Sequence, residues 1–216
     1  MSAGNDNPAL SLRRWHQAPS HGRRILVGPT INVVCYNVLA ESLEDNTTAN
    51  LDPQLAQFQY RKVLLEKELS GWDADVICLQ EVEHYHDFWL PKMESCGYSG
   101  LYQKRGGDKL DGCALFWRSS SFQLLRYRRL GFNVSERFDR DNVALLAELQ
   151  HVEASVPLIV ATTHLLFNKR RGDIKLQQLA MTLRAVGDWL GSDSDSDSDA
   201  GGPPGPGPGP VGEAAG

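Results

Sequence analysis

The sequence of 216 residues lacks several features that would assign it to a common class of protein. It has four cysteines, at positions 35, 78, 96 and 113, and no C-x-x-C pair of the kind used in zinc ribbons and dithiol sites. The first thirty residues contain no apolar stretch typical of a signal peptide, and no window is long and apolar enough to cross a membrane. We therefore expect an intracellular protein with no membrane partner, cytoplasmic or alternatively nuclear, in which Cys35 and Cys78 are buried reduced thiols.

An excess of positive charge is also absent. The formal net charge is −5, and residues 192–216 hold four Asp and Glu213 but no Lys or Arg, which leaves 22 acidic and 22 basic side chains elsewhere. A neutral domain argues against a strongly basic nucleic-acid binder, although a local basic groove stays compatible with it. Residues 126–129 alternate Arg with Tyr, and two interpretations stay open. They form either a strand that follows a phosphate backbone or an exposed strand with solubilising charges.

Three parts of the chain differ in composition. Residues 1–29 mix polar and charged residues without periodicity, so we expect a disordered leader. Residues 192–216 alternate Ser with Asp and then Gly with Pro, which predicts a disordered acidic tail with no packed core. The folded domain is therefore expected in residues 30–191.

The hydrophobic pattern of residues 30–191 predicts strands with interposed helices. The expected strands are residues 31–39, 75–79, 99–103, 113–117, 122–131, 143–150 and 158–163. A helix is expected after the cap Asp52-Pro53, with its apolar face at Leu51, Leu55, Phe58, Leu65 and Leu69 and its end at Gly71, and a shorter helix at residues 88–93. A last helix is expected to bury Leu176, Leu179, Ala180, Leu183, Val186 and Leu190. The fold class is α/β or α+β.

Three expected strands end in polar side chains that suit phosphoryl chemistry, namely Asn37, Glu81 and His164. Amide and carboxylate oxygens suit a hard cation such as Mg²⁺, with Mn²⁺ as the alternative, and a histidine donates to phosphate oxygens. Taken singly, each residue fits a turn former, a capping carboxylate or a hydrogen-bonded structural histidine. We expect the three to converge, because strand ends of one layer share a rim.

These segments, taken with three others, resemble the endonuclease/exonuclease/phosphatase superfamily, and within it the Angel proteins, relatives of nocturnin and the poly(A)-shortening deadenylases. The matching segments, in chain order over residues 31–190, are Tyr36-Asn37-Val38-Leu39-Ala40, Leu79-Gln80-Glu81-Val82-Glu83, Asp111-Gly112-Cys113-Ala114-Leu115-Phe116, Asn142-Val143-Ala144, Thr162-Thr163-His164-Leu165 and Phe167-Asn168-Lys169-Arg170-Arg171-Gly172-Asp173. The resemblance implies a two-sheet sandwich flanked by helices. It also implies a Mg²⁺-dependent hydrolase that acts on RNA 3′ ends, as a 3′–5′ exoribonuclease or in 3′-phosphate processing.

The resemblance also implies roles for individual residues. Glu81 would ligate Mg²⁺, Asn37 would support the metal and the phosphate, and His164 would stabilise charge on the phosphoryl group. The candidate substrate-binding residues are Asp111, Asn142, Asn168, Arg170 and Arg171. For Asp111 and Asn142, a role in strand ends and turns fits the motif as well as catalysis does.

The superfamily's second half brings a Gly-Asp-x-Asn strand end, which positions water and phosphate, and a late Asp-His pair, and neither motif occurs here. We therefore expect the N-terminal half of the domain, roughly one sheet with its helices, and an incomplete or inactive site. Two alternatives stay open, a non-catalytic fragment that binds RNA or protein and a related enzyme that acts on DNA or a small phosphate. RNA is the expected partner of the intact domain. The fragment is expected to self-associate through an uncovered sheet face and edge.

Overall fold

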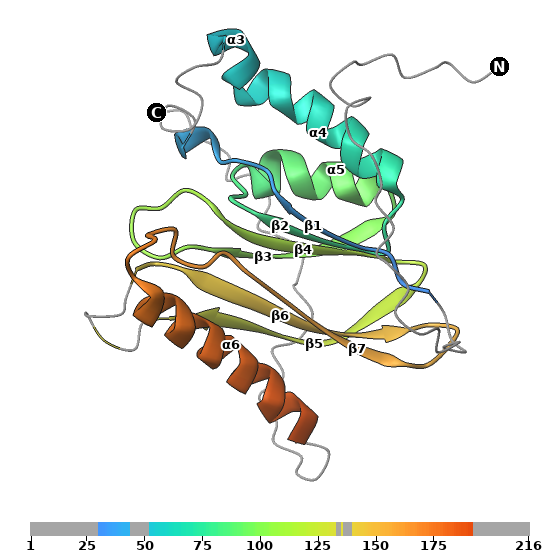
Figure 1. Cartoon of the computed structure of the whole chain (residues 1–216). Helices are drawn as coiled ribbons and strands as arrows, with labels where there is room; N and C mark the ends of the chain where they lie inside the picture. The colour runs from blue at the N-terminus through green and yellow to red at the C-terminus, as the bar shows by residue number, and fades with distance from the viewer. Residues whose placement is uncertain (1–29, 44–51, 133–134, 136–139, 192–216) are drawn as a thin grey trace, which may run out of the picture.

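The structure is a computed structural model of the whole chain and describes residues 30–43, 52–132, 135 and 140–191. The expected leader, residues 1–29, and the expected tail, residues 192–216, lie outside the described residues, so their disorder stays a prediction. Two β-sheets lie face to face, with helices on the outer side of each (Figure 1). The expected class, mixed α/β with two sheets and flanking helices, is confirmed.

The first sheet has the strand order β1-β2-β4-β3. Its strands are β1 (Val33–Asn37), β2 (Val76–Gln80), β3 (Tyr98–Lys104) and β4 (Gly112–Arg118). The pair β1 and β2 is parallel, and the other pairs are antiparallel. Every residue of β2 is buried, as its continuous apolar run predicts for a central strand covered on both faces.

The second sheet has the order β5-β6-β7, with β5 (Phe122–Gly131), β6 (Val143–His151) and β7 (Pro157–Thr163) all antiparallel. The expectation that the chain holds roughly one sheet is wrong. The three strands follow one another along the chain, so they pair as a meander and form a layer of their own. Apolar side chains of both sheets interdigitate between the layers, among them Val76, Leu101, Leu115, Trp117, Leu145 and Leu149.

Helices cover the outer face of the first sheet (Figure 1). They are α3 (Pro53–Ala56), α4 (Phe58–Trp72) and α5 (Leu90–Ser95), preceded by the short turns η1 (Glu41–Leu43) and η2 (Tyr85–Trp89), the latter π-helical. Asp52 caps α3 by accepting from the backbone N–H of Gln54 at 2.9 Å, as expected.

The single helix expected over residues 53–71 is interrupted. Gln57 adopts an extended backbone with ψ 134°, which separates α3 from α4 and leaves Leu55 46% exposed instead of buried. The helix ends one residue beyond the expected Gly71, and Asp73 adopts the left-handed conformation with φ 47°. Phe58, Leu65 and Leu69 do face the core.

Helix α6 (Gly172–Gly191) lies on the outer side of the second sheet (Figure 1). Its buried residues are Ile174, Gln178, Thr182 and Ala185, so the expected leucine face is wrong, with Leu176 at 68% and Leu183 at 60% exposure. The helix carries two stripes at helical spacing, and hydrophobic periodicity alone does not identify the one that meets the sheet. No helix within the described ranges is long and apolar enough to span a membrane.

Strands β1 and β7 are sheet edges in the described part of the chain. Val33 is 57% exposed and Cys35 is exposed, so the expectation that Cys35 is buried is wrong. Exposure alternates along β1, and Val33 and Cys35 lie on its uncovered face. Cys78, the neighbour of Cys35 in β2, is buried, and burial raises the pKa of the Cys78 thiol to about 12. Open edges are compatible with self-association, which stays a prediction.

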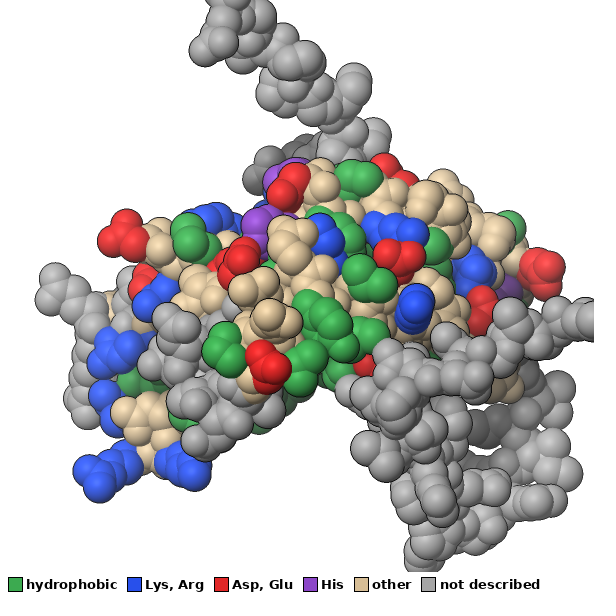
Figure 2. Space-filling view, turned by 90° about the horizontal axis from the view of Figure 1, so that it is seen from above, with side chains coloured by type: hydrophobic (Ala, Val, Ile, Leu, Met, Phe, Trp, Pro, Cys, Tyr) green, Lys and Arg blue, Asp and Glu red, His purple; other side chains and the backbone are tan. Residues whose placement is uncertain are grey.

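The basic residues of β5 are engaged within the protein. Arg126 pairs with Glu148, Arg128 lies 3.6 Å from Asp188, and Arg129 Nε donates to the carbonyl of Tyr102 at 3.1 Å. These contacts favour the interpretation of residues 126–129 as an ordinary exposed strand. On the face seen from above in Figure 2, acidic and basic side chains are interspersed over the upper part, and Lys and Arg side chains gather at the lower left.

Gly112 is the glycine whose replacement is expected to disturb the sandwich most directly. A Cβ at this position would lie 2.3 Å from the Gln103 carbonyl oxygen and 2.8 Å from the Lys104 Cα, and backbone atoms cannot move aside as a side chain can. We expect Gly112→Ala to lower the free energy of unfolding by about 2–3 kcal/mol, measured by urea denaturation. The control Gly187→Ala in α6, where a Cβ meets nothing within 4 Å, is expected to raise it by up to about 1 kcal/mol. Equal effects of the two substitutions would contradict the packing argument.

Candidate functional site

Three polar side chains from the ends of three strands meet at one rim of the sandwich. Asn37 is the last residue of β1, Glu81 follows β2, and His164 follows β7. Asn37 Nδ2 donates to Glu81 Oε1 at 2.8 Å, and His164 Nδ1 lies 3.6 Å from the same oxygen. The expected convergence is confirmed.

The expected reason for this convergence is partly wrong, because the strands belong to different layers. β1 and β2 lie in the first sheet, whereas β7 lies in the second. The two layers are joined next to the site by a buried hydrogen bond from Gln80 Nε2 to Thr162 Oγ1, 3.1 Å long. His164 therefore approaches Glu81 from across the sandwich.

The Glu81 carboxylate is held in a partly buried position. Its side chain is 12% exposed, and its backbone adopts φ 55°, an unfavourable conformation for a residue with a Cβ. Besides the contacts with Asn37 and His164, Oε2 accepts a long hydrogen bond from the backbone N–H of Ala40 at 3.4 Å. The hydrogen bonds from Asn37 and Ala40 replace part of the hydration that the carboxylate loses on burial.

His164 contributes a ring nitrogen with unused hydrogen-bonding capacity. Nδ1 is buried and has no hydrogen-bond partner among the described residues, since its 3.6 Å distance to Glu81 exceeds hydrogen-bonding range. A buried polar atom of this kind is costly unless a ligand or proton-sharing partner satisfies it. The ring is thus placed to serve a ligand bound at Glu81.

The donor set suits a hard divalent cation in part. Glu81 offers a carboxylate, whereas Asn37 Oδ1 already accepts from the backbone N–H of Leu39 at 2.9 Å. An amide oxygen keeps a second lone pair for a ligand. Glu81 is therefore the stronger candidate ligand, and Asn37 mainly orients it.

Arg61 of α4 was not identified from the sequence, and it organises the segment that follows Asn37. Its guanidinium donates to the carbonyls of Val38, at 2.8 Å, and Leu39, at 2.9 Å, and its Nε donates to the carbonyl of Ala56 at 2.7 Å. These bonds hold Leu39 in a left-handed conformation with φ 58°. The sequence does not distinguish an arginine that binds three backbone carbonyls from an arginine on the solvated face of a helix.

Asp111 and Asn142 are both buried, and the structure favours positioning roles for them over direct contact with substrate. Asp111 Oδ1 pairs with Arg105 at 3.4 Å beside β4. Asn142 Nδ2 donates to the backbone carbonyl of His164 at 2.9 Å, and its Oδ1 accepts from Gln178 at 3.1 Å. Gln178 was also not identified from the sequence. The signal available there was a glutamine on the inner face of α6.

Asn168, Arg170 and Arg171 lie in the turn before α6, and their role in substrate binding stays a prediction. Asn168 Oδ1 accepts from the backbone N–H of Arg170. Arg171 makes two bonds to the Asp173 carboxylate, at 2.9 and 2.8 Å, and this hydrogen bonding lowers the pKa of Asp173 to about 2. Within the described residues, no hydrogen bond or ion pair connects these three side chains to Glu81.

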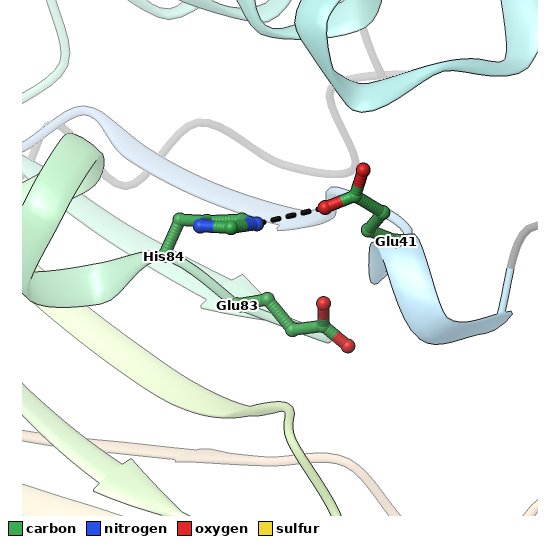
Figure 3. A group of neighbouring side chains, drawn as sticks. All are labelled: Glu41, Glu83 and His84. Carbon is green, nitrogen blue, oxygen red and sulfur yellow. Dashed lines mark hydrogen bonds and ion pairs between the residues drawn. The ribbon is translucent and has the colours of Figure 1, made fainter.

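A second cluster, formed by Glu41, Glu83 and His84, lies beside the site (Figure 3). Candidate ligand atoms of the three lie within 4.8 Å of one another. His84 Nε2 lies 2.9 Å from Glu41, and its Nδ1 lies 3.0 Å from Asp87. Because both ring nitrogens lie within hydrogen-bonding distance of carboxylates, Glu41 and Asp87 account for the position of His84, and the cluster does not require a metal.

The chain matches known proteins over most of its length. The Endonuclease/Exonuclease/phosphatase family matches residues 34–206. Human "Protein angel homolog 2" is 43% identical over 221 residues, which cover 86% of this chain and 40% of that protein. The Angel likeness noted in the sequence is thereby confirmed.

Two solved structures share the arrangement of the sandwich. A crystal structure of ANGEL2, described as a 2′,3′-cyclic phosphatase in complex with adenosine-2′,3′-vanadate, has a TM-score of 0.70 at 38% identity and covers 74% of this chain and 48% of its own. The human Nocturnin catalytic domain with bound sulfate has a TM-score of 0.61 at 25% identity and covers 73% of this chain and 59% of its own. The chain therefore spans half or less of the Angel proteins that it resembles.

The His84 cluster predicts a pH-dependent contribution to stability. Burial alone lowers the pKa of His84, but its hydrogen bonds to Glu41 and Asp87 outweigh burial and raise that pKa above its usual value. The stabilisation is then fully present below the pKa of the unfolded state and is lost as the pH rises through the higher folded-state pKa. We expect His84→Gln to cost about 0.5–1 kcal/mol more at about pH 5.5 than at about pH 8.5, measured by urea denaturation.

The matched control is His86→Gln. His86 is exposed and two residues further on, and its aromatic neighbours Tyr85 and Tyr102 lie edge-on to its ring. Because no hydrogen bond or ion pair joins the His86 ring to a carboxylate among the described residues, its replacement is expected to show a smaller pH dependence than that of His84. A cost of His84→Gln that does not vary with pH would show that His84 acts only through packing, for example on Phe58.

Proposed function

Because the chain belongs to the endonuclease/exonuclease/phosphatase family, we propose that Asn37, Glu81 and His164 bind a divalent cation and the phosphoryl group of an RNA 3′ end. The observation that carries the proposal is the Glu81 carboxylate, held between the Asn37 amide and the unbonded Nδ1 of His164. A hard anionic ligand beside a free imidazole nitrogen suits a phosphoryl group neutralised by a cation.

Each of these residues has a separate task in the proposed site. Glu81 ligates Mg²⁺, or alternatively Mn²⁺, and waters complete the coordination. When bound, the cation polarises a phosphoryl oxygen and stabilises the charge that develops on it. Asn37 orients the Glu81 carboxylate, and a protonated Nδ1 of His164 donates to a phosphoryl oxygen.

We propose a terminal 2′,3′-cyclic phosphate as the substrate class, which is one form of 3′-phosphate processing. The solved relative at 38% identity is described as a 2′,3′-cyclic phosphatase bound to adenosine-2′,3′-vanadate, which supports this choice. Action as a 3′–5′ exoribonuclease is the second candidate within the enzyme class. An intracellular location and an RNA partner belong to the same proposal.

A binding function without turnover is the alternative that a specific observation favours. In the described part of the chain, Glu81 is the one carboxylate with a contact to both Asn37 and His164. Hydrolysis also needs a base or a second carboxylate to orient the attacking water. We therefore propose that these residues bind cation and phosphoryl group and do not complete a hydrolytic site by themselves.

Cation binding provides the first test. We expect weak Mn²⁺ binding by the wild-type chain, because Glu81 supplies one charged ligand and waters must supply most of the others. Glu81→Gln is expected to weaken it at least about tenfold, measured by water-proton relaxation in a Mn²⁺ titration. The matched control is Glu83→Gln. The Glu83 carboxylate accepts a hydrogen bond from the backbone N–H of Ser42, whereas the Glu81 carboxylate faces His164. Equal affinity in the wild type and Glu81→Gln would place the cation elsewhere.

Binding of RNA ends provides the second test. With Mg²⁺ present, we expect an oligoadenylate ending in a 2′,3′-cyclic phosphate to bind more tightly than one ending in a 3′-hydroxyl, and His164→Gln to remove the difference. Fluorescence anisotropy measures both affinities. The same samples are expected to show no hydrolysis. Hydrolysis abolished by Glu81→Gln would show that the chain completes its site, and equal binding of the two ends would contradict the proposed substrate class.

A further inference from the structure

Two buried carboxamides join helix α6 to the segment that carries His164. Gln178 of α6 and Asn142, immediately before β6, are 1% and 3% exposed. Gln178 Nε2 donates to Asn142 Oδ1 at 3.1 Å, and Asn142 Nδ2 donates to the backbone carbonyl of His164 at 2.9 Å. The backbone N–H of Leu166 donates to Gln178 Oε1 at 3.0 Å. These bonds form a continuous amide bridge, made of Asn142 and Gln178, across Leu165.

The amide bridge fixes the chain on both sides of Leu165. A carboxamide donates through its nitrogen and accepts through its oxygen, so each side chain makes one bond in each direction. On the strand side, Thr163 Oγ1 donates to the carbonyl of Val143 at 2.8 Å and anchors the end of β7.

Packing alone does not account for the amide bridge. α6 meets the second sheet next to an apolar cluster that includes Ala144, Leu146 and Ala185. A leucine or methionine at position 178 would suit such surroundings, because a buried polar group is unfavourable unless its hydrogen bonds are made. What the amide bridge adds is a fixed path for the backbone at His164.

The His164 ring depends on that path. Its Nδ1 has no hydrogen bond among the described residues and lies 3.6 Å from Glu81 Oε1, so backbone placement determines how the ring faces the carboxylate. We propose that Gln178 is a positioning residue that acts through Asn142 to hold the His164 ring against Glu81. The inference rests on the proposed function of this site, in which small displacements of a phosphoryl-binding group are costly.

Gln178→Met tests the proposal, since it keeps side-chain length and removes both hydrogen bonds. In the full chain with ¹⁵N-labelled histidine, the His164 ring is assigned by its loss in His164→Gln. We expect its resonances to shift in Gln178→Met while those of His151 stay in place. Hydrogen exchange of the Leu166 amide is expected to accelerate about tenfold.

The matched control is Thr182→Val. It removes another buried hydrogen bond on the same face of α6, from Thr182 Oγ1 to the Gln178 carbonyl at 2.9 Å, and leaves the amide bridge intact. The His164 ring and the Leu166 amide are expected to stay unchanged in it. Equal changes in Gln178→Met and Thr182→Val would reduce the amide bridge to ordinary packing and overturn the proposal.

Gln178→Leu also removes both bonds, and it serves if Gln178→Met does not fold. It is expected to shift the His164 ring and to accelerate exchange of the Leu166 amide, as Gln178→Met does. An unshifted His164 ring in a folded Gln178 variant overturns the positioning role. If Mn²⁺ fails to broaden the wild-type His164 ring but Gln178→Met still shifts it, the proposed function fails and the positioning role stands.

Discussion

The parallel pairing of β1 with β2 determines where the site forms. In this register Asn37 lies beside Gln80, so both strands end at the same level and Asn37 reaches Glu81 with a 2.8 Å hydrogen bond. A shift of one residue would turn the Asn37 side chain to the other face of the sheet and break that contact. The pairing continues beyond the end of β1, where the backbone N–H of Val38 donates to the carbonyl of Gln80 at 3.0 Å.

Two of the loops that leave strands at the site are held by a side chain from a helix on the outside of the sandwich. Arg61 of α4 binds the carbonyls after β1, and Gln178 of α6 binds the segment after β7. Helices on opposite outer faces thus act on two halves of one site. A buried polar group is costly unless its hydrogen bonds are made, so both contacts are directional as well as stabilising.

The sequence allowed good prediction of the strands and of the three meeting side chains, since buried runs that end in polar residues mark the ends of sheets. It did not allow prediction of which layer each strand joins, because pairing depends on contacts distant in sequence. The face of α6 was misjudged for a related reason. Leucines recur at helical spacing along it, but Gln178 and Thr182 face the sheet. Gln178 bonds Leu166 and Asn142, and Thr182 bonds the Gln178 carbonyl, so their polar groups are satisfied on burial.

The division of the site between two sheets bears on its chemistry. Asn37 and Glu81 are fixed relative to each other by strand pairing, whereas His164 reaches Glu81 only through packing of one layer on the other and the bond from Gln80 to Thr162. The proposed cation binding should therefore depend mainly on the first sheet. The proposed recognition of a phosphoryl group, in contrast, requires both sheets, because His164 brings a ring nitrogen that has no hydrogen-bond partner among the described residues. A change in how the layers pack would weaken phosphoryl binding before it weakened cation binding.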